Sequence, residues 1–315
     1  MTRAADQLNV AQPALGLQIR QLEEDLGAVL LLRHSRGVEP TQAGRILFER
    51  AQKILQLVDE TRAEMRGLRG TLAETIRLGI TPSIMNMIGY DLLVEARQTL
   101  PQVFISLTEE LSFVLIDGVK RGELDLALVY EVDEDPALNA KPVAREEVLF
   151  VTSLTDVPPG PIAFADMLAY PLTIPGERDM IRRILENHAS RRGLKVQIAN
   201  EVNSPLAIKT MLLRESASTV VPFGAVADEI NSGRFQARRI VSPMISRTLF
   251  LLRPAGRPPF QHEAAIGAFM TRMTAMLVAK VGELMRPIGG PVMQEPAAQE
   301  TVVSGTALAA EPAQT

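Results

Sequence analysis

Polar residues that suit anion binding stand at four places where a predicted strand gives way to a predicted helix. In an open α/β sheet, a small molecule binds outside the carboxyl ends of the strands, beside helix N-termini whose free N–H groups favour negative charge. A small molecule that bears a carboxylate would fit such donors. The candidate ligand-binding residues are Thr81, Pro82, Ser83, Ser112, Asn203, Ser204, Phe223 and Gly224.

The same residue types also have an ordinary structural use. Serine, threonine and asparagine are common N-caps, and each contributes about 1 kcal/mol to helix stability. Capping therefore explains any one of these positions by itself. The ligand-binding hypothesis rests on the convergence of all four positions on one cleft.

The sequence offers no constellation of residues for catalysis. His34, His188 and His262 lack the spacing of metal ligands, and the chain has no Walker A loop, dinucleotide-binding glycine fingerprint or nucleophile elbow. Glu123 and Asp125 stand near the start of a predicted strand, where a structural role is favoured. We therefore expect no enzyme activity, no metal and no cofactor.

The candidate ligand-binding residues lie in a region, 74–286, where predicted strands and helices alternate. Its first part reads strand Thr75–Ile80, helix Ser83–Leu100, strand Val103–Thr108, helix Ser112–Arg121 and strand Leu124–Val129. That order is typical of one doubly wound lobe. A second set of elements lies between Phe164 and Pro222. The predicted fold class is α/β, with two lobes arranged like the clamshell of a periplasmic binding protein.

Two connections would join the lobes, near Thr152–Pro161 and near Ser246–Leu252. A helix over His262–Met285 would then return to the first lobe, with an inner face made of Ile266, Phe269, Met273, Leu277 and Leu284. Residues 287–315 are rich in Ala, Pro, Gly, Gln and Thr and have little to bury, so we expect this tail to be disordered.

Composition limits the class of protein. The 315 residues include 33 Lys and Arg against 37 Asp and Glu, and they include no cysteine. The length predicts two or three domains, and the lack of cysteine excludes disulfides and fits a reducing compartment. No signal peptide is visible and no apolar run approaches the length of a membrane span. We expect a cytoplasmic protein without a membrane partner.

Two amphipathic helices joined by a turn are predicted at the start of the chain. Ala11–Gly27 carries apolar residues at three- and four-residue spacing, and Thr2–Val10 gives a shorter pattern of the same kind. Pro13 fits the first turn of the second helix, where its missing N–H costs nothing. The pair is typical of a helix-turn-helix, whose second helix can enter a DNA major groove, although such pairs also occur in many other folds.

A small hairpin and a long helix follow. The apolar run Ala28–Leu32 and the turn His34–Gly37 indicate a hairpin that carries Arg33 and Arg36, two groups able to contact a phosphate backbone. From residue 41 to residue 70 an apolar stripe repeats at heptad-like spacing. A helix of this length cannot bury its stripe alone, so a dimerisation helix is favoured over an intramolecular core helix.

Together these residues resemble a known family. The stretch TRAADQLNVAQPALGLQIRQLEEDLG, followed by LLLRHSRGVEPTQAG and a long helix, resembles the winged helix-turn-helix of the LysR-type transcriptional regulators. The resemblance implies a DNA-binding domain at 1–40, a linker and dimerisation helix at 41–70, and a two-lobed effector-binding domain at 74–286. It also implies double-stranded promoter DNA and a small, anionic effector as partners, and a homodimer or homotetramer.

The resemblance assigns DNA contacts to positions in the second helix and in the hairpin. Gln12 and Pro13 match positions that face bases at the start of the recognition helix, and the arginines match backbone contacts of the wing. The candidate DNA-binding residues are Gln12, Pro13, Gly16, Leu17, Gln18, Arg20, Arg33 and Arg36. Residues 1–70 hold ten Lys and Arg against nine Asp and Glu, so this region has almost no net positive charge. Contact with DNA must therefore come from a few specifically positioned side chains.

The chain departs from the family pattern at three places. The family usually has a serine at Gly16 and often a polar residue at Leu17, so we expect this chain to lack a hydroxyl donor to phosphate at the first position and a base or phosphate contact at the second. The family also normally places a further helix ahead of Met1. An alternative function is therefore a truncated member that binds a small molecule but binds DNA poorly. A third alternative function is that of a clamshell enzyme or a transport binding protein. For such a protein we would expect a catalytic cluster or a secretion signal in the sequence.

Overall fold

The computed structural model describes residues 4–5, 11–34, 37–48, 50–51, 54, 58, 61, 74–153, 158–214 and 217–289. In the N-terminal part, helix α2 (Gln12–Leu26) has Pro13 in its first turn, as predicted. Strands β1 (Leu31–His34) and β2 (Gly37–Pro40) form the predicted antiparallel hairpin. Of the first predicted helix only residues 4–5 are described, and both are helical.

Side-chain hydrogen bonds join these N-terminal elements. The Glu23 carboxylate of α2 accepts from the backbone N–H groups of Leu30 at 2.7 Å and Leu31 at 3.1 Å, at the start of the hairpin. Thr41 Oγ1 accepts from Gly44 N at 3.0 Å, which caps the helix that begins at residue 42. The described residues of the predicted linker helix, 42–48, 50–51, 54, 58 and 61, are helical, and its other residues lie outside the described part.

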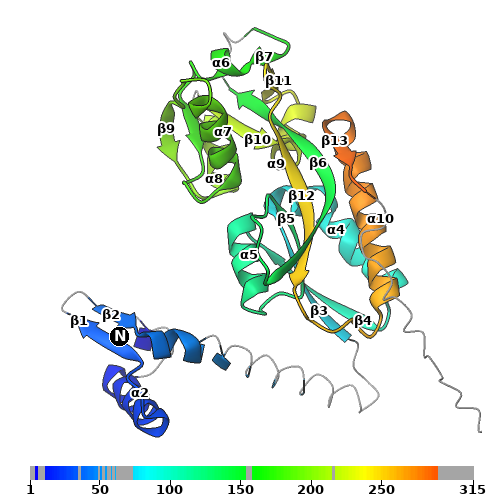
Figure 1. Ribbon diagram of the computed structural model, residues 1–315. Coiled ribbons are helices and arrows are strands. Elements are labelled where there is room, and N and C mark those ends of the chain that lie inside the picture. The colour runs from blue at the N-terminus through cyan, green and yellow to red at the C-terminus, as the bar shows by residue number, and fades with distance from the viewer. Residues whose placement is uncertain are drawn as a thin grey trace, which may run out of the picture.

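The first lobe is a mixed sheet covered by three helices (Figure 1). Parallel strands β3, β4 and β5 stand in the order β4-β3-β5, and β12 runs antiparallel to β5. The elements are β3 (Glu74–Ile80), α4 (Pro82–Thr99), β4 (Val103–Glu109), α5 (Ser112–Lys120), β5 (Leu126–Tyr130), β12 (Ser246–Pro254) and α10 (Glu263–Val281). The predicted strand and helix order of this lobe is confirmed.

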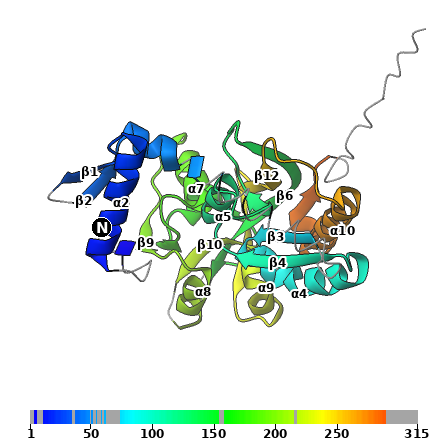
Figure 2. The same cartoon turned by 90° about the horizontal axis from the view of Figure 1, so that it is seen from below.

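The second lobe is built on the strands β10, β8 and β9, and its described residues include four helices (Figures 1 and 2). Its elements are β7 (Ile162–Ala163), α6 (Phe164–Met167), β8 (Leu172–Ile174), α7 (Met180–Ser190), β9 (Ile198–Glu201), α8 (Pro205–Arg214), β10 (Ser218–Pro222), α9 (Phe223–Asn231) and β11 (Gln236–Val241). Asp179 caps α7 by accepting from Ile181 N at 2.8 Å, which fixes the start of that helix.

The two lobes are joined differently from the prediction. Strand β6 (Leu138–Thr152) pairs with β12 in the first lobe through its early residues and with β10 in the second through its last five. The first crossover therefore lies inside β6, whose last residue, Thr152, already pairs with β10 and β11 of the second lobe. Residues 154–157 of the predicted connection lie outside the described part. The second predicted crossover, Ser246–Leu252, is most of β12 as it returns. Charged residues in the middle of β6 hide the strand pattern in the sequence. In the fold, Glu146 forms a buried ion pair with Arg247, and Glu147 forms a half-exposed ion pair with Arg239.

The C-terminal helix ends earlier than predicted. Helix α10 stops at Val281, because Gly282 adopts a φ of 69°, and a short 3-10 turn (Gly282–Leu284) leads into β13 (Met285–Pro287) beside β6. Glycine accepts this backbone conformation at no steric cost. The predicted inner-face residues Ile266, Phe269, Met273 and Leu277 are each about 1% exposed or less. Residues 290–315 of the predicted tail lie outside the described part.

Helix α10 also bears on the membrane question. By length and apolar composition, Glu263–Leu284 is the one helix among the described residues that could cross a membrane. Arg272 and Lys280 interrupt this segment, so it is not a continuous apolar run of that length. The helix packs beside α4 and buries nine residues of α10 (Figure 1). Its burial identifies it as a core helix.

Candidate ligand-binding cleft between the lobes

A cavity of about 270 Å³ lies between α5 of the first lobe and the start of α7 in the second. Its first-lobe wall is Ser112, Phe113, Ile116, Asp117, Lys120, Tyr130, Glu131, Val132, Asp133, Glu134, Asp135 and Leu138. Its second-lobe wall is Arg178, Asp179, Met180 and Arg183. Because both lobes contribute to the wall, a molecule held here would bind them together.

Ser112 is the predicted ligand-binding residue that lines this cavity. It is the first residue of α5, a helix whose N-terminus has no side-chain cap. Ser112 Oγ accepts a hydrogen bond from Tyr130 N at 3.0 Å, so its hydroxyl hydrogen is left to donate. The hydroxyl and the N–H groups of the first turn together suit an anionic oxygen.

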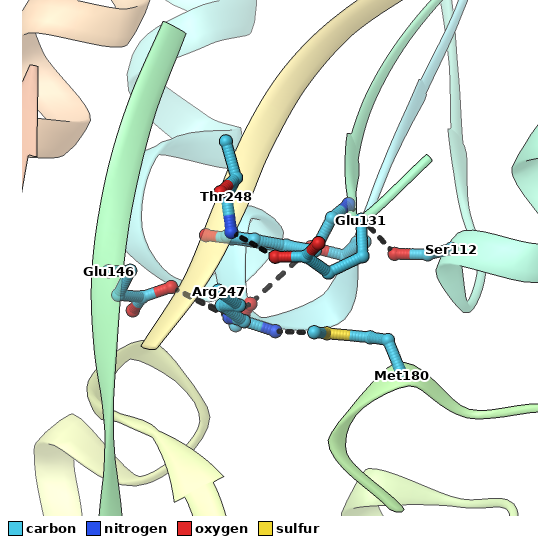
Figure 3. A network of polar contacts seen from close by, with 9 residues as sticks. Ser112, Glu131, Glu146, Met180, Arg247 and Thr248 are labelled. Atoms are coloured by element: carbon cyan, nitrogen blue, oxygen red, sulfur yellow. Dashed lines mark hydrogen bonds and ion pairs between the residues drawn. The ribbon is translucent and has the colours of Figure 1, made fainter. Parts of the chain in front are cut away.

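Next to the cavity-lining residue Met180 lies the buried guanidinium of Arg247, which sequence analysis missed (Figure 3). Arg247, on β12, is 5% exposed and forms an ion pair of 2.8 Å with Glu146 of β6. Its guanidinium carbon lies 3.3 Å from the centre of the Tyr130 ring. Burial lowers the pKa of Arg247, but the Glu146 carboxylate raises it above its usual range, so the group stays charged.

Two predicted residues belong to this arginine network. Ser83 Oγ accepts from Arg247 Nη2 at 3.1 Å, and Thr81 Oγ1 lies 3.4 Å from Ser83 Oγ. Both residues are buried at the start of α4, and neither lines the cavity. Neither Thr81 nor Leu111, the residues before α4 and α5, forms a side-chain cap, so ordinary capping does not account for Thr81.

The other Nη atom of Arg247 faces the second lobe. Arg247 Nη1 has a contact of 4.0 Å to Met180 Sδ, and Met180 lines the cavity (Figure 3). A thioether sulfur is a weak acceptor, and Met is unbranched and rotates easily. An oxygen acceptor entering the cavity past Met180 would therefore find a charged donor.

Two further polar residues are held unusually at the cavity wall. Glu131 has a φ of 49°, and its carboxylate accepts from Thr248 N at 2.5 Å. A non-glycine residue with positive φ is uncommon and is found often at functional sites. Asp179 is buried, and burial raises its pKa, although hydrogen bonds from Ile181 N and the charge of Arg247 lower it.

Ion pairs join the lobes across the mouth of the cavity. Arg178 of the second lobe binds Asp117 of α5 at 2.9 Å and lies over the Phe113 ring at 4.5 Å. Arg183 of α7 lies 3.3 Å from Asp133. Exposed pairs of this kind each contribute little, so they can break and form as the lobes move.

The remaining predicted ligand-binding residues do not line the cavity. Pro82 is the first residue of α4. Asn203 Oδ1 accepts from Gly176 N at 2.8 Å, and Ser204 Oγ accepts from Ala207 N at 3.2 Å as an ordinary cap of α8. Phe223 begins α9 and packs partly buried against the core. The expected convergence of four positions is thus limited to the neighbourhood of Ser112, Ser83 and Thr81.

Gly224 has a different role, at a contact between the lobes. A Cβ atom at this position would lie 2.5 Å from the carbonyl oxygen of Ser83, so only glycine lets α9 approach α4 this closely. Asn86 of α4 donates to the carbonyl of Gly224 at 3.3 Å. The Thr81–Ser83 segment is therefore fixed from the second lobe as well as by Arg247.

The structural role expected for Asp125 is confirmed. Asp125 is 1% exposed, accepts from Arg77 N at 2.7 Å and forms ion pairs with Arg77 and Arg257. These contacts join the start of β5 to β3 and to the segment before α10. Among the described residues, no group of three or more His, Asp or Glu side chains could hold a metal ion.

The N-terminal helix presents most of the predicted DNA-binding residues to solvent. Gln12, Pro13, Leu17, Gln18 and Arg20 are exposed, and Leu17 is 63% exposed. Gly16 is buried, and a Cβ atom added there would meet no atom of the described residues within 4 Å. Arg36 and the side chain of Arg33 lie outside the described part of the chain.

Two regions of the chain match models of known protein families. Residues 1–45 match the family described as "Bacterial regulatory helix-turn-helix protein, lysR family", and residues 69–275 match "LysR substrate binding domain". The nitrogen assimilation regulatory protein nac of Klebsiella aerogenes is 28% identical over 252 residues, which cover 80% of this chain and 82% of the relative.

Solved structures agree with the fold. Full-length CbnR complexed with its target DNA has a TM-score of 0.57 at 21% identity and covers 89% of this chain and 93% of CbnR. The effector binding domain of QuiR in complex with shikimate has a TM-score of 0.56 at 14% identity, over 64% of this chain and 98% of the QuiR chain.

Proposed function

This chain belongs to the LysR family of bacterial transcriptional regulators, and from that premise we propose how it acts. It binds promoter DNA as a homodimer or homotetramer through α2 and the β1–β2 wing, and a small anionic effector between the lobes modulates that binding or the activation that follows. The observation that carries the proposal is the presence, on one chain, of both family matches and an inter-lobe cavity.

The DNA-binding part rests on the exposed face of α2. Gln12 and Gln18 are six residues apart, and both side chains are exposed on the helix that would enter a major groove. Glutamine can read base edges through paired hydrogen bonds, whereas Arg20 and the wing arginines suit phosphates. In this proposal, residues 1–40 form the DNA-binding domain, residues 41–70 the linker and dimerisation helix, and residues 74–286 the effector-binding domain.

The effector-binding part of the proposal rests on hydrogen-bond donors near Ser112 and Met180 of the cavity wall. The uncapped start of α5 with Ser112, and Arg247 Nη1 behind Met180, can both receive a carboxylate oxygen. Because the walls come from both lobes, a bound carboxylate would favour one arrangement of the lobes over another. We take regulation, and not catalysis, to be the function, in the cytoplasm where the chromosome lies.

The alternative is a family member that binds a small molecule but binds DNA poorly. One observation favours it, because Leu22 and Leu26 of α2 are 43% and 49% exposed although they continue the buried side of the helix that Leu15 begins. An apolar face left partly in water weakens a small domain.

A complementation experiment tests the proposal. In a strain lacking the gene, transcripts would be measured after complementation with the wild type, with Gln12→Ala/Gln18→Ala, and with Ser112→Ala. We expect the wild type to restore regulated transcription, the α2 variant to restore none, and Ser112→Ala to restore basal transcription without its response to growth conditions. Full activity of the α2 variant would contradict the proposal.

A further inference from the structure

Three elements of the N-terminal part are tied together through one residue, Leu30. This residue directly precedes β1 and is 6% exposed. Thr41 directly follows β2 and precedes the helix that begins at residue 42, which we name the linker helix. Because β1 and β2 pair along their whole length, Leu30 and Thr41 meet at the base of the hairpin. The backbone of Leu30 is hydrogen-bonded on both sides there.

The N–H side of this junction is held by α2. Glu23 Oε1 accepts from Leu30 N at 2.7 Å and from Leu31 N at 3.1 Å. Hydrogen bonds to an ionised carboxylate are stronger than those between neutral groups, and two consecutive N–H groups on one oxygen fix the direction of the chain. The wing is therefore held against α2 at the residue where it begins.

The carbonyl side of the junction is held by Thr41. Leu30 O accepts from Thr41 N at 2.9 Å and from Thr41 Oγ1 at 3.2 Å, and the same hydroxyl donates to Val29 O at 2.7 Å. Thr41 Oγ1 also accepts from Gly44 N at 3.0 Å. One side chain thus joins the base of the hairpin to the first turn of the linker helix.

Gly44 lets this turn approach the wing more closely than another residue type would. A Cβ atom at Gly44 would lie 2.2 Å from Leu30 O and 3.1 Å from Leu30 C. These atoms belong to backbone that Glu23 and Thr41 already hold, so they cannot turn aside as the end of a side chain can. Any side chain at residue 44 must therefore push the linker helix away from the wing.

Capping does not explain why glycine stands at residue 44. The bond from Gly44 N to Thr41 Oγ1 is an ordinary N-cap and would form with any residue at position 44 except proline. Glycine weakens a helix relative to alanine, so its use inside the first turn needs another reason. The contact with Leu30 O supplies that reason.

The junction has a consequence for a dimer that binds DNA. If two copies associate through their linker helices, the angle between the linker helix and α2 sets the distance between the two α2 helices. A dimer fits half-sites whose spacing along the duplex matches that distance. The angle at the junction therefore selects the spacing, although the contact of Gly44 with Leu30 O lies outside the predicted DNA contacts.

We propose that Gly44 is a positioning residue for operator recognition. Its close contact with Leu30 O, held in place by Glu23 and Thr41, makes α2, the wing and the start of the linker helix one rigid unit and so selects the spacing of the half-sites. This inference rests on the proposed function, because it needs a dimer that binds promoter DNA.

The first test measures the distance between the two α2 helices in the free protein. The chain has no cysteine, so Gln21→Cys, an exposed change on α2, places a single spin label on each copy. Double electron–electron resonance would compare this chain with the same chain carrying Gly44→Ala. We expect the main distance to shift by about 2 Å or more, because relief of the contact needs about 1 Å in each copy. An unchanged distance, or a chain that gives no distance because it is monomeric, would overturn the inference.

The second test measures the preferred spacing of the half-sites. Half-sites would be mapped on the chain's own promoter by footprinting, and duplexes would be made with one or two base pairs inserted or deleted between them. We expect the wild type to bind one spacing about tenfold more tightly than the others, and Gly44→Ala to prefer a different spacing or none. A variant that is merely unstable would lose affinity equally for every duplex and keep the wild-type preference, and that result would overturn the inference.

Matched variants of Thr41 decide the matter even if Gly44→Ala does not fold. Thr41→Val removes the hydroxyl at nearly the same volume and should change the distance and the preferred spacing, whereas Thr41→Ser keeps the hydroxyl and should change neither. Gln42→Ala, an exposed change in the same turn, should also change neither. Identical behaviour of Thr41→Val and Thr41→Ser would overturn the inference.

Failure of this inference and failure of the proposed function give different results. Equal binding of the wild type to promoter and scrambled duplexes would remove the proposed function. A wild-type preference for the promoter and for one spacing, kept unchanged by Gly44→Ala and by Thr41→Val, would remove only the inference about Gly44.

Discussion

At the scale of single residues, the buried pair Arg247 and Glu146 carries the largest consequence. Arg247→Met leaves the Glu146 carboxylate buried without its partner, and breaking a buried pair in this way costs about 3–5 kcal/mol of unfolding free energy. Replacing both residues, as in Arg247→Met/Glu146→Leu, should cost less than the single change. Urea unfolding of the wild type, Arg247→Met, Glu146→Leu and the double variant measures the coupling, and strictly additive losses would contradict a direct pair.

The charge of Asp179 sets a pH dependence. Burial raises its pKa in the folded protein above the unfolded value near 3.8, so the ionised form costs stability at neutral pH and this cost disappears as the pH falls below 3.8. Asp179→Asn keeps the oxygen that accepts from Ile181 N. We expect the variant to unfold at a higher urea concentration than the wild type at pH 7, with the difference shrinking towards pH 4. A variant less stable at pH 7 would show that Arg247 needs this carboxylate.

Gly16 offers a change that should strengthen DNA binding. A Cβ atom there would meet no atom of the described residues within 4 Å, serine costs a helix less than glycine does, and its hydroxyl can donate to a phosphate. Gly16→Ser should therefore bind promoter DNA several-fold more tightly in anisotropy titrations, with Gly16→Ala separating the helix effect from the hydroxyl. Equal affinities of the serine and alanine variants would exclude the phosphate contact.

At the scale of elements, the strands and helices around the cleft could be predicted, but the crossing strand could not. β3, α4, β4, α5 and β5 follow from their apolar periodicity. The sequence of β6 instead places Arg145, Glu146 and Glu147 in its middle, and a strand pattern appears there only once Arg247 and Arg239 are known to pair with the two glutamates. Those partners are 101 and 92 residues away, beyond any local pattern.

The same limit applies to the candidate site. Ser112 and the Thr81–Ser83 segment were found because strand ends and helix starts are local features. Arg247, Met180 and Glu131 were missed, since a charged residue within a strand and a methionine at a helix start carry no local signal of a cleft. Asn203 and Ser204 match the same local pattern as Ser112 but lie outside the cavity wall.

The linker helix carries a prediction of its own. Ile54 and Val58, four residues apart, are 61% and 39% exposed on a single chain, as expected of a stripe that a second copy covers. Ile54→Glu should shift the protein from dimer to monomer in sedimentation velocity, whereas Arg45→Glu, an exposed change on the polar side of the helix, should leave the dimer intact. A dimer unaffected by Ile54→Glu would place the interface elsewhere.

At the scale of the whole molecule, one chain carries a DNA-binding end with little net charge and a cavity whose wall comes from both lobes. A monomer with so few cations would bind DNA weakly, so specific affinity needs two recognition helices on two half-sites. The ion pairs across the cleft mouth are exposed, and a ligand that binds both lobes can therefore change their arrangement at little cost.

The most direct measurement is fluorescence anisotropy of the full chain on duplex from its own promoter, against a scrambled duplex, across salt from about 50 to 200 mM. We expect tighter binding to the promoter, with an affinity that falls steeply as salt rises and a preference that Gln12→Ala/Gln18→Ala removes. Equal affinity for the two duplexes at every salt concentration would contradict the central claim that this chain is a sequence-specific regulator.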